Sequence, residues 1–311
     1  MRITEDILYL EVGDIIVYRG LIWGTGKTFS DNINCINYYE HLGEIQIVGV
    51  TSKNNLLGNI MGYSFVEKEN IKETAFDIII VMADKCVFQE IRGEAMRIGI
   101  PDSVVISYKI FRLPKINIKK YLEIKKNPPT IFVNNCWGGL TYHQLGLEFY
   151  SPFINMFESD VDYLKFLHNP RKYIDSQLEY IEDEYEVNLK RMYPVCKCDD
   201  IILHFNHYLS FEEANRCWER RKSRINWDNL FVAMITSNEE SAISFSKLQY
   251  MKKICFVPFD LKMPSLECIN LNFNTDNSSN TFKSIINGMA IGTNLYYDPV
   301  ELLNSGNIKR L

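Results

Sequence analysis

His204 and His207, within "ILHFNHYLS", form an H-x-x-H spacing, and both residue types can bind metals or move protons. In a continuing strand this odd spacing puts the two side chains on opposite faces, so one metal could bind both only if the strand turned between them. We therefore interpret His204 as a core histidine that could also contact a substrate. His207 is the candidate general base, because imidazole titrates near neutral pH.

Cys136 lies in "NNCWGG" (134–139), where a predicted strand gives way to a helix. A helix N-terminus lowers the pKa of a thiol, so this position is typical of a nucleophile. The alternative is a small residue packed under the Gly138-Gly139 turn. Cys196 and Cys198 have no matching second pair, and we predict no metal site.

The stretch "GTGKT" (24–28) resembles a phosphate-binding loop. An ATPase loop needs G-x-x-x-x-G-K-[ST], and Gly26-Lys27-Thr28 fits its end. The opening glycine should lie at position 21, which is Leu21, while Gly20 comes one residue too early. The spacing therefore disfavours an ATPase.

A dinucleotide-type loop, G-x-G-x-x-G between a strand and a helix, fits Gly24 and Gly26, but Phe29 replaces the third glycine. The next strand runs into Thr51-Ser52-Lys53 and lacks the acid that would bind a ribose. NAD is thus disfavoured, and a nucleotide-containing donor held by Gly24, Gly26, Lys27 and Thr28 is the predicted ligand. The alternative is that these glycines simply make the turn.

Strand-like runs rich in β-branched residues alternate with helical segments along the whole chain. The predicted strands are 14–23, 45–50, 77–82, 103–107, 130–133, 200–205, 230–235, 253–257 and 268–273. Residues 160–192 are predicted mostly helical, with a break before Pro170. We predict an α/β protein of two Rossmann-like α/β domains, each a mostly parallel sheet flanked by helices. They are an N-terminal domain (1–112), a basic, proline-containing connector (113–129) and a second α/β domain (130–311).

Polar residues follow the predicted strands of the second domain, and the carboxyl ends of parallel strands meet at one edge. We expect these residues to form a site, with Asp260 as a further catalytic candidate beside His207 and Cys136. Trp137 could stack on a sugar ring, although core packing is the commoner role of tryptophan. The substrate-binding candidates are Asn134, Asn135, Trp137, Gly138, Gly139, His204, Arg221, Arg224 and Asn238.

Arg221 and Arg224, in "WERRKSRINW", lie three residues apart late on a predicted helix. Arginine forks suit a phosphate or pyrophosphate, so the pair could clamp a donor. The alternative is that these cations simply complement the helix dipole.

Composition excludes several classes of protein. The net charge is −5 and no Lys/Arg block stands out, so we expect no nucleic-acid partner. No apolar run approaches the roughly 20 residues needed to span a bilayer, and the N-terminus lacks a signal-peptide pattern. We expect a cytoplasmic protein whose eight cysteines are reduced.

The motifs "NNCWGGLTYHQLGLEFYSPFINMF", "DYLKFLHNPRKYI" and "LHFNHYLSFEEANRCWERRKSRINWDNLFVAM" resemble a bacterial family of unknown function. Its members are commonly labelled exopolysaccharide or capsule biosynthesis proteins. The N-terminal half is similar to Rossmann-like modules attached to sugar-modifying acyltransferases and nucleotide-sugar enzymes, departing at Phe29 and at the missing ribose-binding acid.

The resemblance implies a role in exopolysaccharide biosynthesis, with acyl or glycosyl transfer on a sugar nucleotide or a lipid-linked sugar. It also implies peripheral contact with a membrane-bound synthesis complex. The alternative function is a non-catalytic protein that binds a nucleotide sugar or acts as a scaffold in such a complex.

Overall fold

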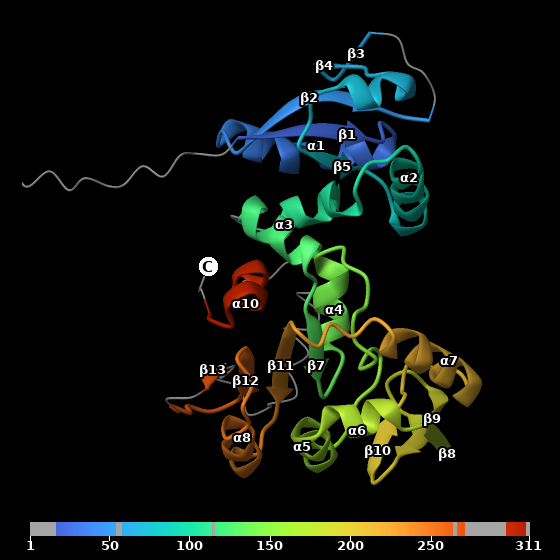
Figure 1. Ribbon diagram of the computed structural model, residues 1–311, viewed down its shortest axis with the longest axis vertical. Helices are drawn as coiled ribbons and strands as arrows, with labels where there is room; N and C mark the ends of the chain where they lie inside the picture. The colour runs from blue at the N-terminus through green and yellow to red at the C-terminus, as the bar shows by residue number, and fades with distance from the viewer. Residues whose placement is uncertain (1–16, 54–57, 114–115, 264–265, 271–296, 309–311) are drawn as a thin grey trace, which may run out of the picture. The chain divides into compact units, whose positions relative to one another are not determined.

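The computed structural model describes residues 17–53, 58–113, 116–263, 266–270 and 297–308 (Figure 1). The chain is mixed α/β and divides into two compact units, Met1–Phe111 and Arg112–Leu311. Each unit contains a parallel sheet flanked by helices, which confirms the predicted α/β class.

The first unit is built on a parallel sheet with the strand order β2-β1-β5-β6. Its strands are β1 (Tyr18–Trp23), β2 (Ile45–Thr51), β3 (Asn59–Ile60), β4 (Tyr63–Ser64), β5 (Ile78–Val81) and β6 (Val105–Ser107). Its helices are α1 (Lys27–His41) and α2 (Lys85–Arg97), with 3-10 turns η1 (Lys68–Glu73), η2 (Asp102–Val104) and η3 (Tyr108–Arg112). The short β3 and β4 pair with each other as a small antiparallel ladder.

Alternating side chains of this sheet face two different helices. Leu21, Trp23 and Ile79 belong to a core cluster with Phe88 and Ile91 of α2. The buried face of α1 lies outside that cluster, so α1 and α2 cover opposite faces. The chain leaves β1 toward β2 on one side and later returns to β5 on the other. The carboxyl ends of β1 and β5 therefore form a topological switch point, where ligands bind in open α/β sheets.

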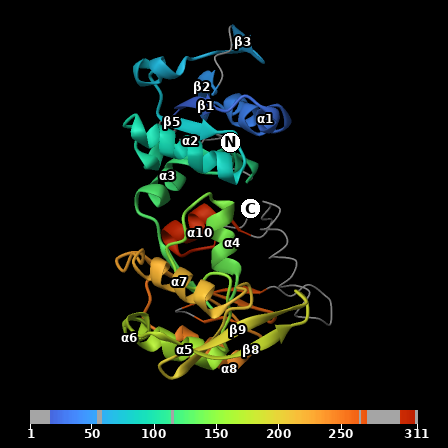
Figure 2. The same ribbon diagram turned by 90° about the vertical axis from the view of Figure 1, so that its right-hand side faces the viewer.

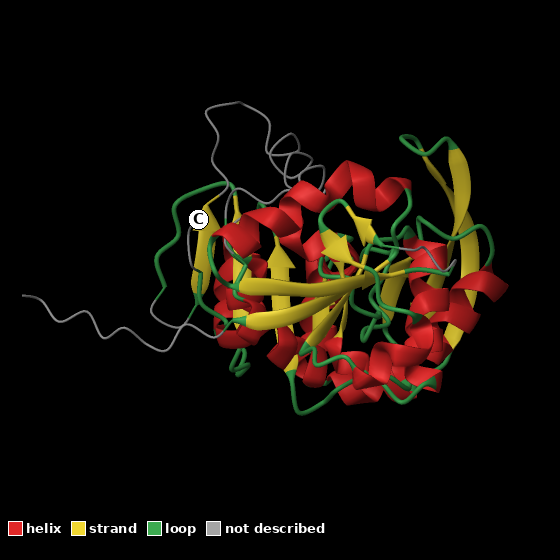
Figure 3. Cartoon of the chain, turned by 90° about the horizontal axis from the view of Figure 1, so that it is seen from above, coloured by secondary structure: helices red, strands yellow, loops and turns green. Residues whose placement is uncertain are grey.

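The second unit contains a parallel sheet, β13-β12-β11-β7, and a separate antiparallel sheet, β10-β9-β8 (Figures 2 and 3). The strands are β7 (Thr130–Val133), β8 (Leu178–Glu186), β9 (Arg191–Cys198), β10 (Ile201–His204), β11 (Leu230–Ile235), β12 (Lys253–Val257) and β13 (Glu267–Asn270). The helices are α3 (Ile118–Lys126), α4 (Trp137–Gln144), α5 (Asp160–His168), α6 (Pro170–Asp175), α7 (Phe211–Lys222), α8 (Glu239–Ser246) and α10 (Pro299–Ser305). One buried cluster joins β7, β11 and β12 to α5, α7, α8 and the antiparallel sheet.

Three expectations for the second unit differ from the structure. The predicted connector 113–129 contains α3, which Asn117 caps by accepting from the Lys120 N–H at 2.9 Å. Strand 200–205 was expected in the parallel sheet, but β10 pairs antiparallel with β9. The helical pattern of 160–192 ends with α6, and the rest forms the hairpin β8–β9 seen in Figure 2. In β8, pairing with the buried β9 overrides the helical periodicity.

Within the part of the chain that the structure describes, no helix combines the length and apolar character needed to cross a bilayer.

The two glycines of the β1–α1 turn have different roles in the fold. Gly24 has φ +114°, and a Cβ there would lie 2.8 Å from the carbonyl oxygen of Met82. Gly26 has φ −83°, and a Cβ there would meet no atom within 4 Å. The fold therefore requires glycine at position 24 and leaves open space at position 26.

We predict that Gly24→Ala destabilises the first unit by about 1–3 kcal/mol, through positive φ and the clash with Met82. Gly26→Ala should change stability by less than about 0.5 kcal/mol. Thermal unfolding of the two variants checks this, and equal losses of stability would contradict the distinction.

Candidate functional site

The polar side chains at the carboxyl ends of β7 and β11 form hydrogen bonds with other groups of the protein. The Asn134 amide donates to the carbonyl oxygen of Ile235 at 3.0 Å and accepts from its N–H at 3.0 Å. Asp160 accepts from the Thr236 hydroxyl at 2.5 Å and from Asn134 at 3.3 Å. Asn134 thus fastens β7 to β11 instead of facing a substrate.

Two other predicted binding residues accept hydrogen bonds from backbone N–H groups at the starts of helices. Asn135 accepts from the Trp137 N–H at 2.9 Å, at the start of α4. Asn238 accepts from the Ser241 N–H at 3.0 Å and caps α8. These contacts explain their polarity without a ligand.

Trp137, Gly138 and Gly139 belong to the core. Trp137 is fully buried, donates from Nε1 to the Tyr297 hydroxyl at 2.7 Å and stacks on Phe231. A Cβ on Gly138 would lie 3.0 Å from the Val133 side chain, and one on Gly139 would lie 3.3 Å from Ile154. The sequence hypothesis of a sugar-stacking Trp137 is therefore wrong for this structure, because no face of the ring reaches solvent.

Cys136 and His207 are brought together from distant parts of the chain. Cys136 occupies the position before α4, and its Sγ lies 3.5 Å from Nε2 of His207. The chain turns after β10, where the Tyr208 N–H donates to the Phe205 carbonyl oxygen at 2.9 Å. His207 is exposed and Cys136 is partly buried, so the pair lies at the protein surface.

Both members of this pair are neutral near neutral pH. Burial, and then the charge of Glu158, raises the pKa of Cys136 to about 11. Partial desolvation of the imidazole, and then the charge of Arg191, lowers the pKa of His207, although Glu186 acts in the opposite direction. The thiol therefore keeps its proton and the imidazole is free to accept it, which is the arrangement of a nucleophile with a general base.

Glu158 is the most unusual residue near the pair. It is 5% exposed, and neither carboxyl oxygen has a hydrogen-bond partner among the described residues. Burial, and then the charge of Asp162, raises its pKa well above the ordinary value. Backbone bonds at 2.9 Å between Phe157 and His204 hold the preceding residue against β10. Glu158 is thus a buried acid near Cys136, with a raised pKa and with no hydrogen-bond partner among the described residues, and such an unpaired buried polar group costs free energy.

His204 does not join His207. Its ring stacks on Phe157 with 4.6 Å between centroids, and its Nδ1 lies 3.4 Å from the carboxylate of Glu184 and from the Tyr193 hydroxyl. This is the packed histidine that its strand position favoured. Among the described residues, no group of three or more His, Cys, Asp or Glu side chains could hold a metal ion.

The arginine pair does not form a clamp. Arg221 is buried, donates to the Tyr208 hydroxyl and lies over the Phe149 ring. Arg224 is half-buried, and its guanidinium lies 3.9 Å from the carboxylate of Glu148. Because Arg221 is buried inside the second unit, the hypothesis that this pair clamps a phosphate is wrong for this structure.

Asp260 accepts from the Asn270 amide at 2.5 Å, beyond the carboxyl ends of β12 and β13. No described contact joins Asp260 to Cys136 or His207, so it stays apart from the pair.

Glu158 and Arg191 were not predicted from the sequence. Nothing in the stretch "MFESDVD" indicates that Glu158 is buried, because the pairing of Phe157 with His204 that positions Glu158 is a long-range contact.

The four predicted donor-binding residues of the first unit line one cavity of about 880 Å³. Gly24, Gly26, Lys27 and Thr28 are joined there by Ser52 and Lys53 after β2, and by residues of η1 and α2. The structure thus brings the GTGKT turn and the end of β2 to the same cavity.

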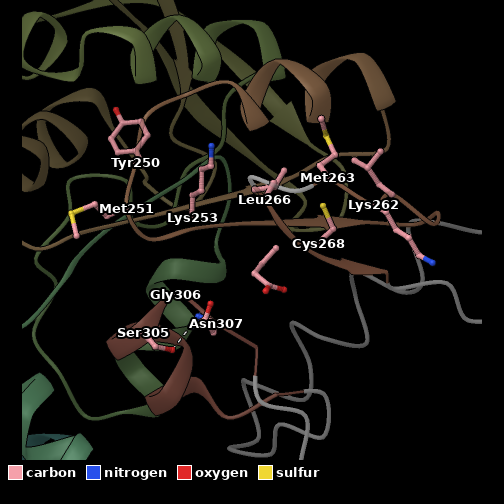
Figure 4. Close-up of a pocket in the computed structure, with 12 residues that line it drawn as sticks. Tyr250, Met251, Lys253, Lys262, Met263, Leu266, Cys268, Ser305, Gly306 and Asn307 are labelled. Carbon is pink, nitrogen blue, oxygen red and sulfur yellow. Dashed lines mark hydrogen bonds between the residues drawn. The ribbon is translucent and has the colours of Figure 1, made fainter.

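A pocket of about 670 Å³ lies in the second unit, bounded by the starts of β12 and β13 and by the end of α10 (Figure 4). Its buried amine, on Lys253, donates to the carbonyl oxygens of Ser246 at 2.5 Å and Leu248 at 2.6 Å. The pocket opens at the amino ends of parallel strands, opposite the edge where α/β sheets bind ligands. We therefore place the candidate chemistry at Cys136 and His207.

We predict that Glu158→Gln stabilises the protein increasingly as pH rises. Because the folded state raises this pKa, the wild type holds the proton more tightly when folded and loses stability above the ordinary glutamate pKa of 4.5. The glutamine variant has no titrating carboxyl group at this position, so the difference in unfolding free energy should grow as pH rises above the ordinary glutamate pKa. Thermal unfolding of both proteins, with the exposed Glu179→Gln as control, measures it. A stability difference that does not change with pH would contradict the raised pKa of Glu158.

Comparison with known proteins gives relatives for both parts of the chain. Residues 16–106 match a family model described as C2185-like, N-terminal. An uncharacterized protein of Haemophilus influenzae is 35% identical over 130 residues, covering 41% of this chain and 60% of the relative. The chain thus spans less than two thirds of the curated relative that it matches. Residues 107–304, more than half of the sequence, match the model of a domain of unknown function, DUF1919, and the chain belongs to that family.

Proposed function

We propose that this protein transfers an acyl group through Cys136 to a sugar in bacterial exopolysaccharide biosynthesis. The acceptor would be a sugar nucleotide or a lipid-linked sugar. The single observation that carries the proposal is the 3.5 Å approach of the Cys136 Sγ to Nε2 of His207 at the carboxyl end of β7. The pathway rests on the resemblance of the "NNCWGG" and "RINWDNLF" motifs described above.

The reaction would take place in two steps. The Cys136 sulfur attacks the carbonyl carbon of the donor while Nε2 of His207 takes the thiol proton, and the leaving group departs with that proton. A hydroxyl of the sugar then attacks the thioester, and His207 takes the hydroxyl proton. The departing Cys136 sulfur recovers that proton, so the enzyme returns to its starting state.

The electrostatics of the site favour this route over a preformed thiolate. A thiol with a pKa of about 11 is almost fully protonated at neutral pH, so attack requires proton transfer to a base. His207 has a lowered pKa and lies within reach of the sulfur.

A different observation favours the alternative, a non-catalytic scaffold. The β8–β9 hairpin exposes several large apolar side chains, and such surfaces mark interaction sites. They are Tyr180, Ile181, Tyr185, Val187, Leu189 and Met192. The same hairpin carries acids at positions 179, 182, 183, 184 and 186, which disfavour an anionic lipid surface and favour a protein of the synthesis complex as its partner.

Incubation with acetyl-CoA, followed by peptide mass mapping, tests the transferase proposal. We expect an acetyl adduct on the Cys136 peptide that hydroxylamine removes and that Cys136→Ser abolishes. His207→Gln should slow its formation by about 10²–10⁴-fold, the usual contribution of a general base. Cys86→Ser, at an exposed cysteine, is the matched control and should change nothing.

Formation of the adduct at an unchanged rate in His207→Gln would contradict the proposed base. Modification of Cys86 with none on Cys136 would contradict the nucleophile and favour the scaffold.

A further inference from the structure

The 880 Å³ cavity of the first unit lies at the topological switch point of its sheet. Its walls come from the carboxyl ends of β1, β2 and β5, the start of α1, and one side of α2. A volume of this size exceeds what a single phosphate ion needs and falls within the range of pockets for nucleotide-sized ligands. The parallel sheet thus presents an open site at the edge where such sheets bind ligands.

Two lysines that line the cavity, Lys27 and Lys53, are available to bind an anion. Lys68 is paired with Glu94 at 2.6 Å, but none of the ion pairs between described residues engages Lys27 or Lys53. Both lysines are exposed and line the cavity, Lys27 from the start of α1 and Lys53 from the turn after β2. Two unpaired ammonium groups that face one space attract a group with more than one negative charge.

The backbone beside Lys27 is also open to a ligand. Gly26 lacks any contact that would exclude a Cβ, so the fold itself does not need glycine there. Glycine is instead the residue that allows the closest approach of another group to the backbone. Gly26 supplies no side-chain cap, and the Phe29 N–H donates to the Gly26 carbonyl oxygen at 3.0 Å, so the N–H groups of Lys27 and Thr28 are the ones that the helix leaves without an acceptor.

An unpaired buried hydroxyl lies at the carboxyl end of β2, one residue before the first β2-side residue that lines the cavity. Thr51 is 0% exposed, and its Oγ1 has no hydrogen-bond partner among the described residues. Thr51 pairs in register with Trp23, so its side chain lies on the same face of the sheet as Trp23, which lines the cavity. Thr51 does not itself line the cavity, so a ligand bound there would satisfy its hydroxyl only through a bridging water.

Other residues that line the cavity suit a nucleoside. Trp23, Met82, Val87 and Ile91 provide an apolar wall. Asp84 lies at the start of α2, and its carboxylate makes no capping bond to that helix. A free carboxylate beside an apolar wall can accept hydrogen bonds from ribose hydroxyls.

We propose that this cavity binds a nucleoside diphosphate, with its phosphates against Gly26, Lys27 and Lys53 and its ribose toward Asp84. The site lies within the first unit, so it holds whether or not Cys136 is a nucleophile. The proposal adds a ligand site to the acyl-transfer function and does not depend on it.

Binding of UDP and ADP to the full chain by titration calorimetry tests the proposal, with pyrophosphate alone as a third probe. We expect either nucleotide to bind at least about tenfold more tightly than pyrophosphate, because the apolar wall and Asp84 contact only the nucleoside. Gly26→Val, Lys27→Ala and Lys53→Ala should each weaken nucleotide binding by about tenfold or more. Lys72→Ala, at an exposed lysine of η1 outside the cavity, is the matched control.

Unfolding midpoints of the variants separate loss of binding from loss of folding, since Gly26→Val fills open space. Absence of UDP and ADP binding to the wild type would overturn the proposal. Binding that survives unchanged in Gly26→Val and Lys27→Ala would overturn it as well. Pyrophosphate binding as tight as that of the nucleotides would reduce the site to an anion site and overturn the nucleoside assignment.

Discussion

The side-chain amide of Asn134 continues the hydrogen-bond ladder between β7 and β11 one residue beyond Val133. This bond fixes where β7 stops and where the chain turns into α4. Gly138 then lets α4 approach the side chains of Val133 and Ile131, which fixes Cys136 at the edge of the sheet. The position of the candidate nucleophile therefore follows from polar and glycine residues whose own role is structural.

Several buried side-chain groups among the described residues have no hydrogen-bond partner, and two of them lie near the candidate sites. Glu158 is a buried acid with no partner, and Thr51 is a buried hydroxyl with none among the described residues. Most buried polar groups in folded proteins are hydrogen-bonded, so each exception asks for a physical reason. In this chain one lies beside Cys136, and the other lies at the strand end next to the cavity of the first unit.

The alternation of buried strands and helices was sufficient to predict the α/β class. "YRGLIW" and "IIIV" are β-branched or aromatic runs whose burial leaves few alternatives to a central strand. The hairpin of β8 and β9 could not be predicted, because the local sequence of the acidic β8 favours a helix. Its strand conformation depends on pairing with β9.

The site was predictable in part, for similar reasons. Cys136 and His207 were marked by residue type and by their places at strand ends. Glu158 was not, because its burial depends on a contact between Phe157 and β10 that local sequence does not encode. Asn134, Trp137 and Arg221 have the residue types of a binding site, but tertiary contacts engage them in the core.

The central claim is that His207 acts on the Cys136 thiol. The rate of alkylation of Cys136 by iodoacetamide, followed against pH in the wild type and in His207→Gln, tests it most directly. The account predicts an inflection at the His207 titration in the wild type. In the variant, a single rise should remain, governed by the thiol pKa of about 11. Identical profiles in the two proteins would contradict the account, because the imidazole would then have no influence on the sulfur.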